Sequence, residues 1–157
     1  MQKIKPFLWF DTQAEEAMNF YVGIFKDSKA GFVSRYGDAG PGPKGTAMVA
    51  TFSLAAQEFM AINGGQSISP QAPSFYVDCD TQEEVDDLWE KLSADGGSKG
   101  QCGWLKDKFG VSWNIVPTIL GKLMGDPDPA KSQRVMQAML KMTKLDIAAL
   151  QKAYDGE

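Results

Sequence analysis

The stretch WFDTQAEEAMNFY, residues 9–21, decides the fold, because much of it returns as YVDCDTQEEVDDLW, residues 76–89. Both copies run from an aromatic, strand-like segment into Asp-Thr-Gln and then into a helical apolar pattern with paired acidic residues. A unit that occurs twice in a chain of 157 residues predicts two halves built on one plan. The repetition therefore indicates, first of all, a duplicated structural framework and not by itself a functional site.

Each copy also predicts how its helix begins. In the first copy Thr12 is placed as the N-cap and Glu15 follows three residues later, which is the capping-box arrangement. Thr81 and Glu84 repeat this arrangement in the second copy. The acidic run at 83–87 is typical of a helix N-terminus and its solvated face, and an acid–base role is the alternative.

Short strand-like segments surround both predicted helices. One precedes each helix, at residues 6–10 and 74–77. The strands expected after the first and second helices lie at 31–36, 46–54 and 57–62, and at 102–107 and 111–116. We therefore predict an α+β protein in which two βαβββ modules form a cupped, mixed or antiparallel sheet, with a cleft between the modules.

The division of the chain follows from this order. We expect residues 1–64 to form the first module, 65–74 a linker, and 75–117 a shortened second module. Residues 118–157 are expected to form a C-terminal helical extension. Its methionine-rich apolar stripes predict packing against the sheets or a subunit, and an adaptable docking surface for a partner is the alternative.

Composition and charge exclude several classes of partner. The chain is 43% hydrophobic and 23% charged, as in ordinary soluble globular proteins. Its net charge is −4 and its basic residues are scattered, so we expect no nucleic-acid partner. No apolar run approaches the roughly 20 residues of a membrane-spanning helix, and the N-terminal apolar stretch is too short for a signal peptide. We therefore expect a cytoplasmic protein with no membrane partner.

The chain contains no histidine. A Ser-His-Asp triad, a Cys-His dyad and a histidine-based metal site are therefore excluded. Its two cysteines, Cys79 and Cys102, are far apart in the sequence, and we expect two reduced, half-buried thiols. A redox pair, the alternative, would need their Cα atoms within about 7 Å.

The paired modules and their motifs resemble the vicinal oxygen chelate superfamily, which includes glyoxalase I, bleomycin-resistance proteins and extradiol dioxygenases. The resemblance rests on residues 6–21, 59–65, 74–92, 102–117 and 134–150. Within that superfamily the chain is most similar to the subfamily described as 3-demethylubiquinone-9 3-methyltransferase domain. The resemblance implies a homodimer and a cupped sheet that encloses a cavity for a small-molecule ligand.

Metal-using members of that superfamily hold a divalent ion with histidines and carboxylates. The corresponding positions here fall near Pro6, within 72–74 and on Asn114, where neither an imidazole nor a carboxylate occurs. We therefore expect no metal and no cofactor. S-adenosylmethionine sites usually have a glycine-rich turn between a strand and a helix, whereas GDAGPGPKG, residues 37–45, lies between two predicted strands. Its prolines predict a long hairpin loop that overhangs the cleft.

Strand alternation predicts which side chains line the cavity. If Asn114 faces it, Ser112 and Val116 do too, and Trp113 and Ile115 point at the helix layer. The candidate ligand-binding residues are Trp9, Phe52, Asn63, Ser74, Trp104, Ser112 and Asn114. Core packing is the alternative for Trp9 and Trp104, and a turn role is the alternative for Asn63.

Three functions remain. The leading hypothesis is a metal-independent small-molecule binding protein, with an apolar or aromatic ligand in the cleft between the modules of a homodimer. The second is an enzyme, either a methyltransferase acting on a quinone-type ring or a lyase or isomerase. The third is an interaction module that uses the C-terminal helices.

Overall fold

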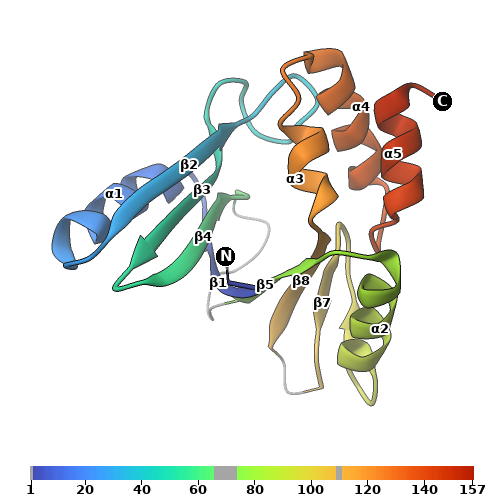
Figure 1. Cartoon of the computed structure of the whole chain (residues 1–157), viewed down its shortest axis with the longest axis horizontal. Helices are drawn as coiled ribbons and strands as arrows, with labels where there is room; N and C mark the ends of the chain where they lie inside the picture. The colour runs from blue at the N-terminus through green and yellow to red at the C-terminus, as the bar shows by residue number, and fades with distance from the viewer. Residues whose placement is uncertain (1, 66–73, 109–110) are drawn as a thin grey trace. The chain divides into compact units, whose positions relative to one another are not determined.

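The computed structural model describes residues 2–65, 74–108 and 111–157 (Figure 1). The chain divides into two compact units, Met1–Phe75 and Tyr76–Glu157. Each contains strands and helices in the order that the duplicated sequence predicts, so the α+β class with two βαβββ modules is confirmed. Most of the predicted linker, 66–73, lies outside the described residues.

The first module is a four-stranded sheet with one helix. Its elements are β1 (Ile4–Phe10), α1 (Ala14–Ile24), β2 (Lys29–Arg35), β3 (Ala47–Leu54) and β4 (Gln57–Asn63). The strand order is β2-β3-β4-β1. The β1–β4 pair is parallel and the other two pairs are antiparallel, so β1, β2 and β4 end at the edge of the sheet where β3 begins.

Helix α1 covers one face of this sheet. Ala14 and Met18 pack against Ala50, Phe52 and Ala61, and all five side chains are buried. Aromatic rings extend this core, because Phe52 stacks on Phe59 with 5.4 Å between ring centroids. Alternate residues of each strand must then point to the opposite face.

The start of α1 differs from the prediction. Its N-cap is Gln13, which makes no side-chain capping bond, so the predicted capping box of Thr12 and Glu15 is wrong. The side-chain oxygen of Asn63, at the end of β4, instead accepts a hydrogen bond from the N–H of Ala14 at 2.8 Å. A residue from a distant strand thus satisfies a backbone donor that a local cap would otherwise satisfy.

The second unit holds the second module and the C-terminal extension. The module consists of β5 (Ser74–Cys79), α2 (Gln82–Ser93), β6 (Ser98–Lys99), β7 (Trp104–Lys106) and β8 (Ser112–Pro117), in the strand order β5-β8-β7-β6. Val85 and Trp89 of α2 pack on Ile115 of β8, with Trp113 beside them. The predicted orientation of Trp113 and Ile115 toward the helix layer is therefore confirmed.

The capping box of the second copy is confirmed. The Thr81 hydroxyl accepts a hydrogen bond from the Glu84 N–H at 3.2 Å, and the Glu84 carboxylate accepts one from the Asp80 N–H at 2.9 Å. Both cysteines are free, as expected. Cys102 is half-buried, whereas Cys79 is fully buried.

The C-terminal extension contains α3 (Ile119–Met124), α4 (Pro129–Leu140) and α5 (Ile147–Asp155), close to the predicted helices. These helices share a small core of Leu123, Val135 and Leu150. Asp128 and Asp146 cap α4 and α5 through hydrogen bonds from backbone N–H groups. No helix in the described ranges is long and apolar enough to cross a membrane.

Candidate functional site

The face of the first sheet opposite α1 is largely apolar. Val49, Ile62 and Trp9 form one cross-strand row over β3, β4 and β1. Met60 and Phe7 are paired in a second row. We call these five residues the apolar platform. Phe7 is buried and the other four are partly exposed, so the platform offers apolar surface on a face that α1 does not cover.

Two glycines fix the Trp9 ring at one end of the platform. The indole N–H donates a hydrogen bond to the Gly65 carbonyl oxygen at 3.0 Å. A Cβ atom at Gly64 would lie 1.8 Å from the indole ring, so only glycine allows this contact. Because its polar atom is satisfied and its position is fixed, the indole presents a preorganised aromatic surface.

Two other candidates, Ser74 and Phe52, have different surroundings. Ser74 is buried, and its hydroxyl donates a hydrogen bond to the Phe7 carbonyl oxygen at 2.6 Å. Phe52 lies in the core beneath α1, on the face opposite to Trp9. Phe52 is therefore a core residue, and a ligand that contacts Trp9 cannot contact it across the sheet.

The three candidates of the second module lie together. Trp104 of β7 pairs with Asn114 of β8, and Ser112 is two residues earlier on the same strand. All three point away from α2, because Trp113 and Ile115 point toward it. The buried Asn114 amide donates a hydrogen bond to the Cys102 carbonyl oxygen at 3.1 Å. A ligand site shared by these residues and Trp9, in a cleft between the modules, stays a prediction.

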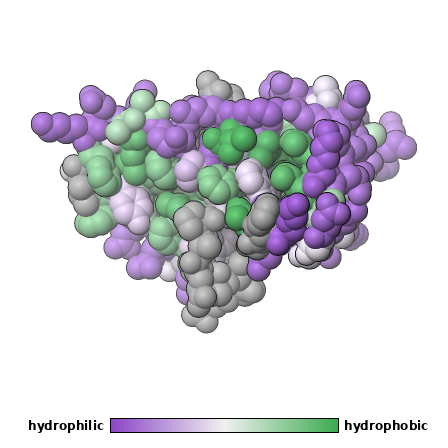
Figure 2. Space-filling view, turned by 90° about the horizontal axis from the view of Figure 1, so that it is seen from below, coloured by the Kyte–Doolittle hydropathy of each residue, from purple (hydrophilic) through white to green (hydrophobic). Residues whose placement is uncertain are grey.

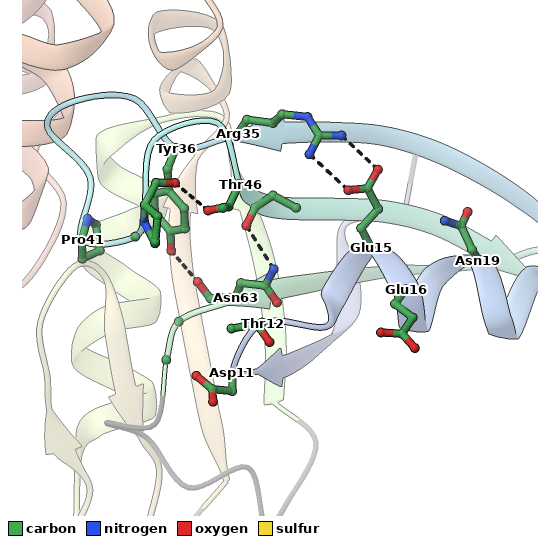
Figure 3. Close-up of a pocket in the computed structure, with 15 residues that line it drawn as sticks. Asp11, Thr12, Glu15, Glu16, Asn19, Arg35, Tyr36, Pro41, Thr46 and Asn63 are labelled. Atoms are coloured by element: carbon green, nitrogen blue, oxygen red, sulfur yellow. Dashed lines mark hydrogen bonds and ion pairs between the residues drawn. The ribbon is translucent and has the colours of Figure 1, made fainter.

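A hollow of about 770 Å³ opens at the edge of the first sheet where β1, β2 and β4 end (Figure 3). We call it the rim hollow. Its lining comes from the start of α1, the β2–β3 loop and the end of β4: Asp11, Thr12, Glu15, Glu16, Asn19, Arg35, Tyr36, Pro41, Gly42, Pro43, Thr46, Ala47, Asn63, Gly64 and Gly65. Of the sequence-predicted candidates, only Asn63 lines it.

The glycine-rich loop at 37–45 forms one wall of the rim hollow. It joins β2 to β3, as predicted, and folds around the ring of Tyr36. Cβ atoms at Gly40 and Gly42 would lie 2.5 and 2.3 Å from that ring. The Tyr36 hydroxyl donates a hydrogen bond to the Asn63 carbonyl oxygen, and burial raises the pKa of this phenol. The glycines therefore serve a close contact with an aromatic ring.

The rim hollow has an acidic lining. Arg35 donates two hydrogen bonds to the Glu15 carboxylate, at 3.0 and 3.1 Å, and so neutralises it (Figure 3). Within the described part of the chain, the side chains of Thr12, Glu16 and Asn19 have no hydrogen-bond or ion-pair partner. These groups are available to a ligand.

No signal in the sequence marked the rim hollow, because its lining comes from three separate stretches of the chain, within 11–19, 35–47 and 63–65. The described ranges contain no group of three or more His, Cys, Asp or Glu residues that could hold a metal ion. The polar groups of Ser74 and Asn114 bind the backbone carbonyls of Phe7 and Cys102.

Comparisons with known proteins find matches to the part of the chain that holds the two modules. The family described as 3-demethylubiquinone-9 3-methyltransferase matches residues 2–116. A solved structure of a protein from Staphylococcus aureus is 32% identical, has a TM-score of 0.58, and is matched over 73% of this chain and 95% of that chain. A PhnB protein from Bacillus cereus is 41% identical over 74% of this chain and 100% of that chain, with a TM-score of 0.39.

None of the curated proteins matches this chain. The family match ends within β8, so the helices α3, α4 and α5 lie outside it.

Proposed function

Because the chain belongs to the 3-demethylubiquinone-9 3-methyltransferase family and has its glyoxalase/bleomycin-resistance-like fold, we propose that it binds a small apolar or aromatic molecule without a metal ion. The ligand lies against the apolar platform of the first module. Its binding is non-covalent, and the protein sequesters it.

The observation that supports this proposal most directly is the fixed Trp9 ring within the apolar platform. A partly exposed apolar surface with an aromatic ring whose polar atom is already satisfied favours a planar or apolar ligand. Ile62 and Met60, the strand partners of Trp9 and Phe7, continue this surface. Removing such surface from water stabilises a complex by about 25 cal/mol per Å².

The residues at the family's metal positions support metal-independent binding. Pro6 offers no ligand atom in its side chain, the stretch 72–74 offers only the Ser74 hydroxyl in place of an imidazole, and Asn114 offers an amide in place of a carboxylate. Both of these groups already bind backbone carbonyls. The chain also has no histidine that could serve as a general base.

The family's description favours methyl transfer as the second candidate function. The glycine-rich segment that such a reaction would need instead joins two strands and encloses Tyr36. Isothermal titration calorimetry with S-adenosylmethionine decides between the two, because tight binding of that donor would favour the methyltransferase. The third candidate, docking through the C-terminal helices, is not favoured, since their apolar residues pack on each other.

A thermal-shift screen tests the binding proposal. We expect at least one compound from a broad panel of aromatic and quinone-like molecules to raise the melting temperature. The substitution Met60→Lys in the platform should abolish this shift, and Phe20→Lys, at a residue on α1 that is 63% exposed, should preserve it. Circular dichroism of both variants checks that they fold.

No stabilisation by any compound, or an equal shift in Met60→Lys, would refute the proposal. The homodimer and the cytoplasmic location stay predictions, and light scattering of the purified protein tests the first of them.

A further inference from the structure

The rim hollow is lined by polar side chains from one side of α1 (Figure 3). Asn19 follows Glu15 by four positions and Glu16 by three, so these three residues stand on the same side of the helix. Thr12 precedes the helix and lines the same hollow. We call these four residues the polar stripe. Met18, on the side of α1 that is turned to the sheet, is buried in the core, so the polar stripe faces the hollow and not the core.

Three members of the polar stripe offer unused hydrogen-bonding groups. Within the part of the chain that the structure describes, the side chains of Thr12, Glu16 and Asn19 have no partner in the protein, and all three are exposed. The Thr12 hydroxyl and the Asn19 amide can each donate and accept, whereas the Glu16 carboxylate only accepts. These groups are hydrated in solution, so a ligand that replaces their water must offer both donors and acceptors.

The fourth member, Glu15, is held in an ion pair that keeps further bonding capacity. Arg35 donates hydrogen bonds to both oxygens of the Glu15 carboxylate, at 3.0 and 3.1 Å. The guanidinium has other N–H groups, and each carboxylate oxygen can accept a second hydrogen bond. Both side chains are partly exposed. The pair therefore adds donors and acceptors in a fixed geometry without adding net charge.

The loop between β2 and β3 forms an apolar wall of the hollow. Pro41 and Pro43 line it and are exposed, and Figure 3 shows Pro41 across the hollow from Asn19. Proline rings present C–H groups and no N–H donor. A ligand in the hollow thus meets polar groups on one side and C–H groups on the other.

This lining disfavours two classes of ligand. Most of its residues are polar, so an apolar molecule would remove the unused groups from water without replacing their hydrogen bonds. Exposed apolar residues, which suit such a molecule, are seen on the side of the protein that Figure 2 shows. The Glu16 carboxylate repels an anion, and the nearby Arg35 is already paired with Glu15.

We propose that the rim hollow is a second ligand site, which binds a neutral molecule with several adjacent hydroxyl groups, such as a sugar or a cyclic polyol. Each hydroxyl both donates and accepts, so the ligand can donate to the Glu16 carboxylate and accept from the Asn19 amide. Its carbon skeleton lies against Pro41 and Pro43.

Two further observations support this class of ligand and separate the site from the one proposed above. An amine cation fits less well, because it offers no acceptor to the N–H groups of Asn19 and Arg35. The volume of about 770 Å³ is that of ordinary small-molecule sites. No residue of the apolar platform lines the hollow, so the two proposals stand or fall separately.

A matched set of ring compounds tests the proposal on the full chain. The probes are myo-inositol and D-glucose, and the controls of similar size are cyclohexanol and cyclohexylamine. In an NMR titration of the nitrogen-labelled protein, we expect at least one polyol to cause saturable amide shifts centred on Thr12, Glu16, Asn19 and Gly42. Cyclohexanol, which has a single hydroxyl, should cause no saturable shift at these residues.

Two variants and one control sharpen the test. Asn19→Leu removes the amide and should weaken polyol binding by about two- to tenfold, the usual effect of one lost hydrogen bond. Glu16→Gln removes a charged acceptor and should weaken it by at least as much. Glu83→Gln makes the same change on the first turn of α2, as Glu16→Gln does on the first turn of α1, and should leave the affinity unchanged. Circular dichroism of the three variants checks that they fold.

Four results would overturn the proposal. These are the absence of saturable shifts with either polyol, equal shifts with cyclohexanol, and tighter binding of cyclohexylamine than of the polyols. The fourth is an unchanged affinity in both Asn19→Leu and Glu16→Gln, since the polyol would then bind elsewhere. None of these results bears on the apolar platform, which the thermal-shift screen tests.

Discussion

The side-chain oxygen of Asn63 accepts a hydrogen bond from the backbone N–H of Ala14 at 2.8 Å, although the residues are 49 positions apart. Ala14 is the first residue of α1 and Asn63 is the last of β4, so the end of a strand caps a helix. The same amide donates a hydrogen bond to the Ala47 carbonyl oxygen at 3.0 Å. The start of α1 therefore depends on the tertiary structure of the module.

The substitution Asn63→Ala should destabilise the protein. It would leave the Ala14 N–H and the Ala47 carbonyl oxygen without their partner in a buried setting. Each unsatisfied buried group costs about 1–3 kcal/mol, so we expect a loss in the free energy of unfolding at or above that range. Urea denaturation followed by circular dichroism measures it.

The two Asp-Thr-Gln copies provide the control. Thr81→Ala removes a helix cap and should cost about 1 kcal/mol. Thr12→Ala removes no cap and should stay within about 0.5 kcal/mol of the wild type. Equal losses in the two variants would contradict the assignment of Asn63 as the residue that caps α1.

The substitution Gly64→Ala should displace the Trp9 ring. The new Cβ atom would lie 1.8 Å from the indole, so the ring must move and lose its hydrogen bond to Gly65. Overpacking of this kind typically costs about 1–3 kcal/mol. We expect the indole N–H resonance of Trp9 to shift in the NMR spectrum and binding at the apolar platform to weaken.

Gly23→Ala is the matched control for this prediction. Gly23 lies near the end of α1, and a Cβ atom there would meet nothing within 4 Å. Alanine favours a helix over glycine by up to about 1 kcal/mol, so this variant should be as stable as the wild type or more stable. An unmoved Trp9 resonance in Gly64→Ala would show that the ring is not held by this contact.

Local pattern was sufficient to predict the element order of both modules. Alternation in the strands and helical spacing after each Asp-Thr-Gln are properties of neighbouring residues, and all the strands except the two-residue β6 were found from them. The orientation of Trp113 and Ile115 followed from the same alternation. These features need no information about distant parts of the chain.

The features that sequence reasoning missed depend on tertiary contacts. The letters Asp-Thr-Gln are identical in both copies, yet Thr81 caps its helix and Thr12 does not, because Asn63 reaches Ala14. Phe52 lies under α1 because β3 pairs in a register that places it beside Phe59. The rim hollow arises only when three separate stretches of the chain meet, so no single motif identifies it.

The substitution Gln82→Ala should loosen the C-terminal extension. Gln82 makes two hydrogen bonds to the backbone of residues 145–147, and their loss should reduce stability by about 1–3 kcal/mol. Hydrogen exchange should become faster in α5. Gln13→Ala, at the exposed glutamine of the first copy, should change the free energy of unfolding by no more than about 0.5 kcal/mol. It should also leave the rate of hydrogen exchange in α5 unchanged.

Docking of the same extension should weaken in acid. Hydrogen bonds from Lys144 and then from Gln82 hold the pKa of Asp86 below its ordinary value of 3.8. As the pH falls, the Asp86 carboxylate therefore takes up its proton at a higher pH in the unfolded chain than in the folded chain. The contribution of Asp86 to stability is thus fully present above pH 3.8, and it is lost as the pH falls through the lowered pKa. We expect Asp86→Asn to be less stable than the wild type at neutral pH, and the two urea-denaturation curves to converge as the pH falls below 3.8. The difference at neutral pH should be small and should shrink in high salt, because both partners are partly exposed. If the difference in stability between wild type and Asp86→Asn stayed constant as the pH fell well below 3.8, the Asp86–Lys144 pair would not contribute to docking in this way.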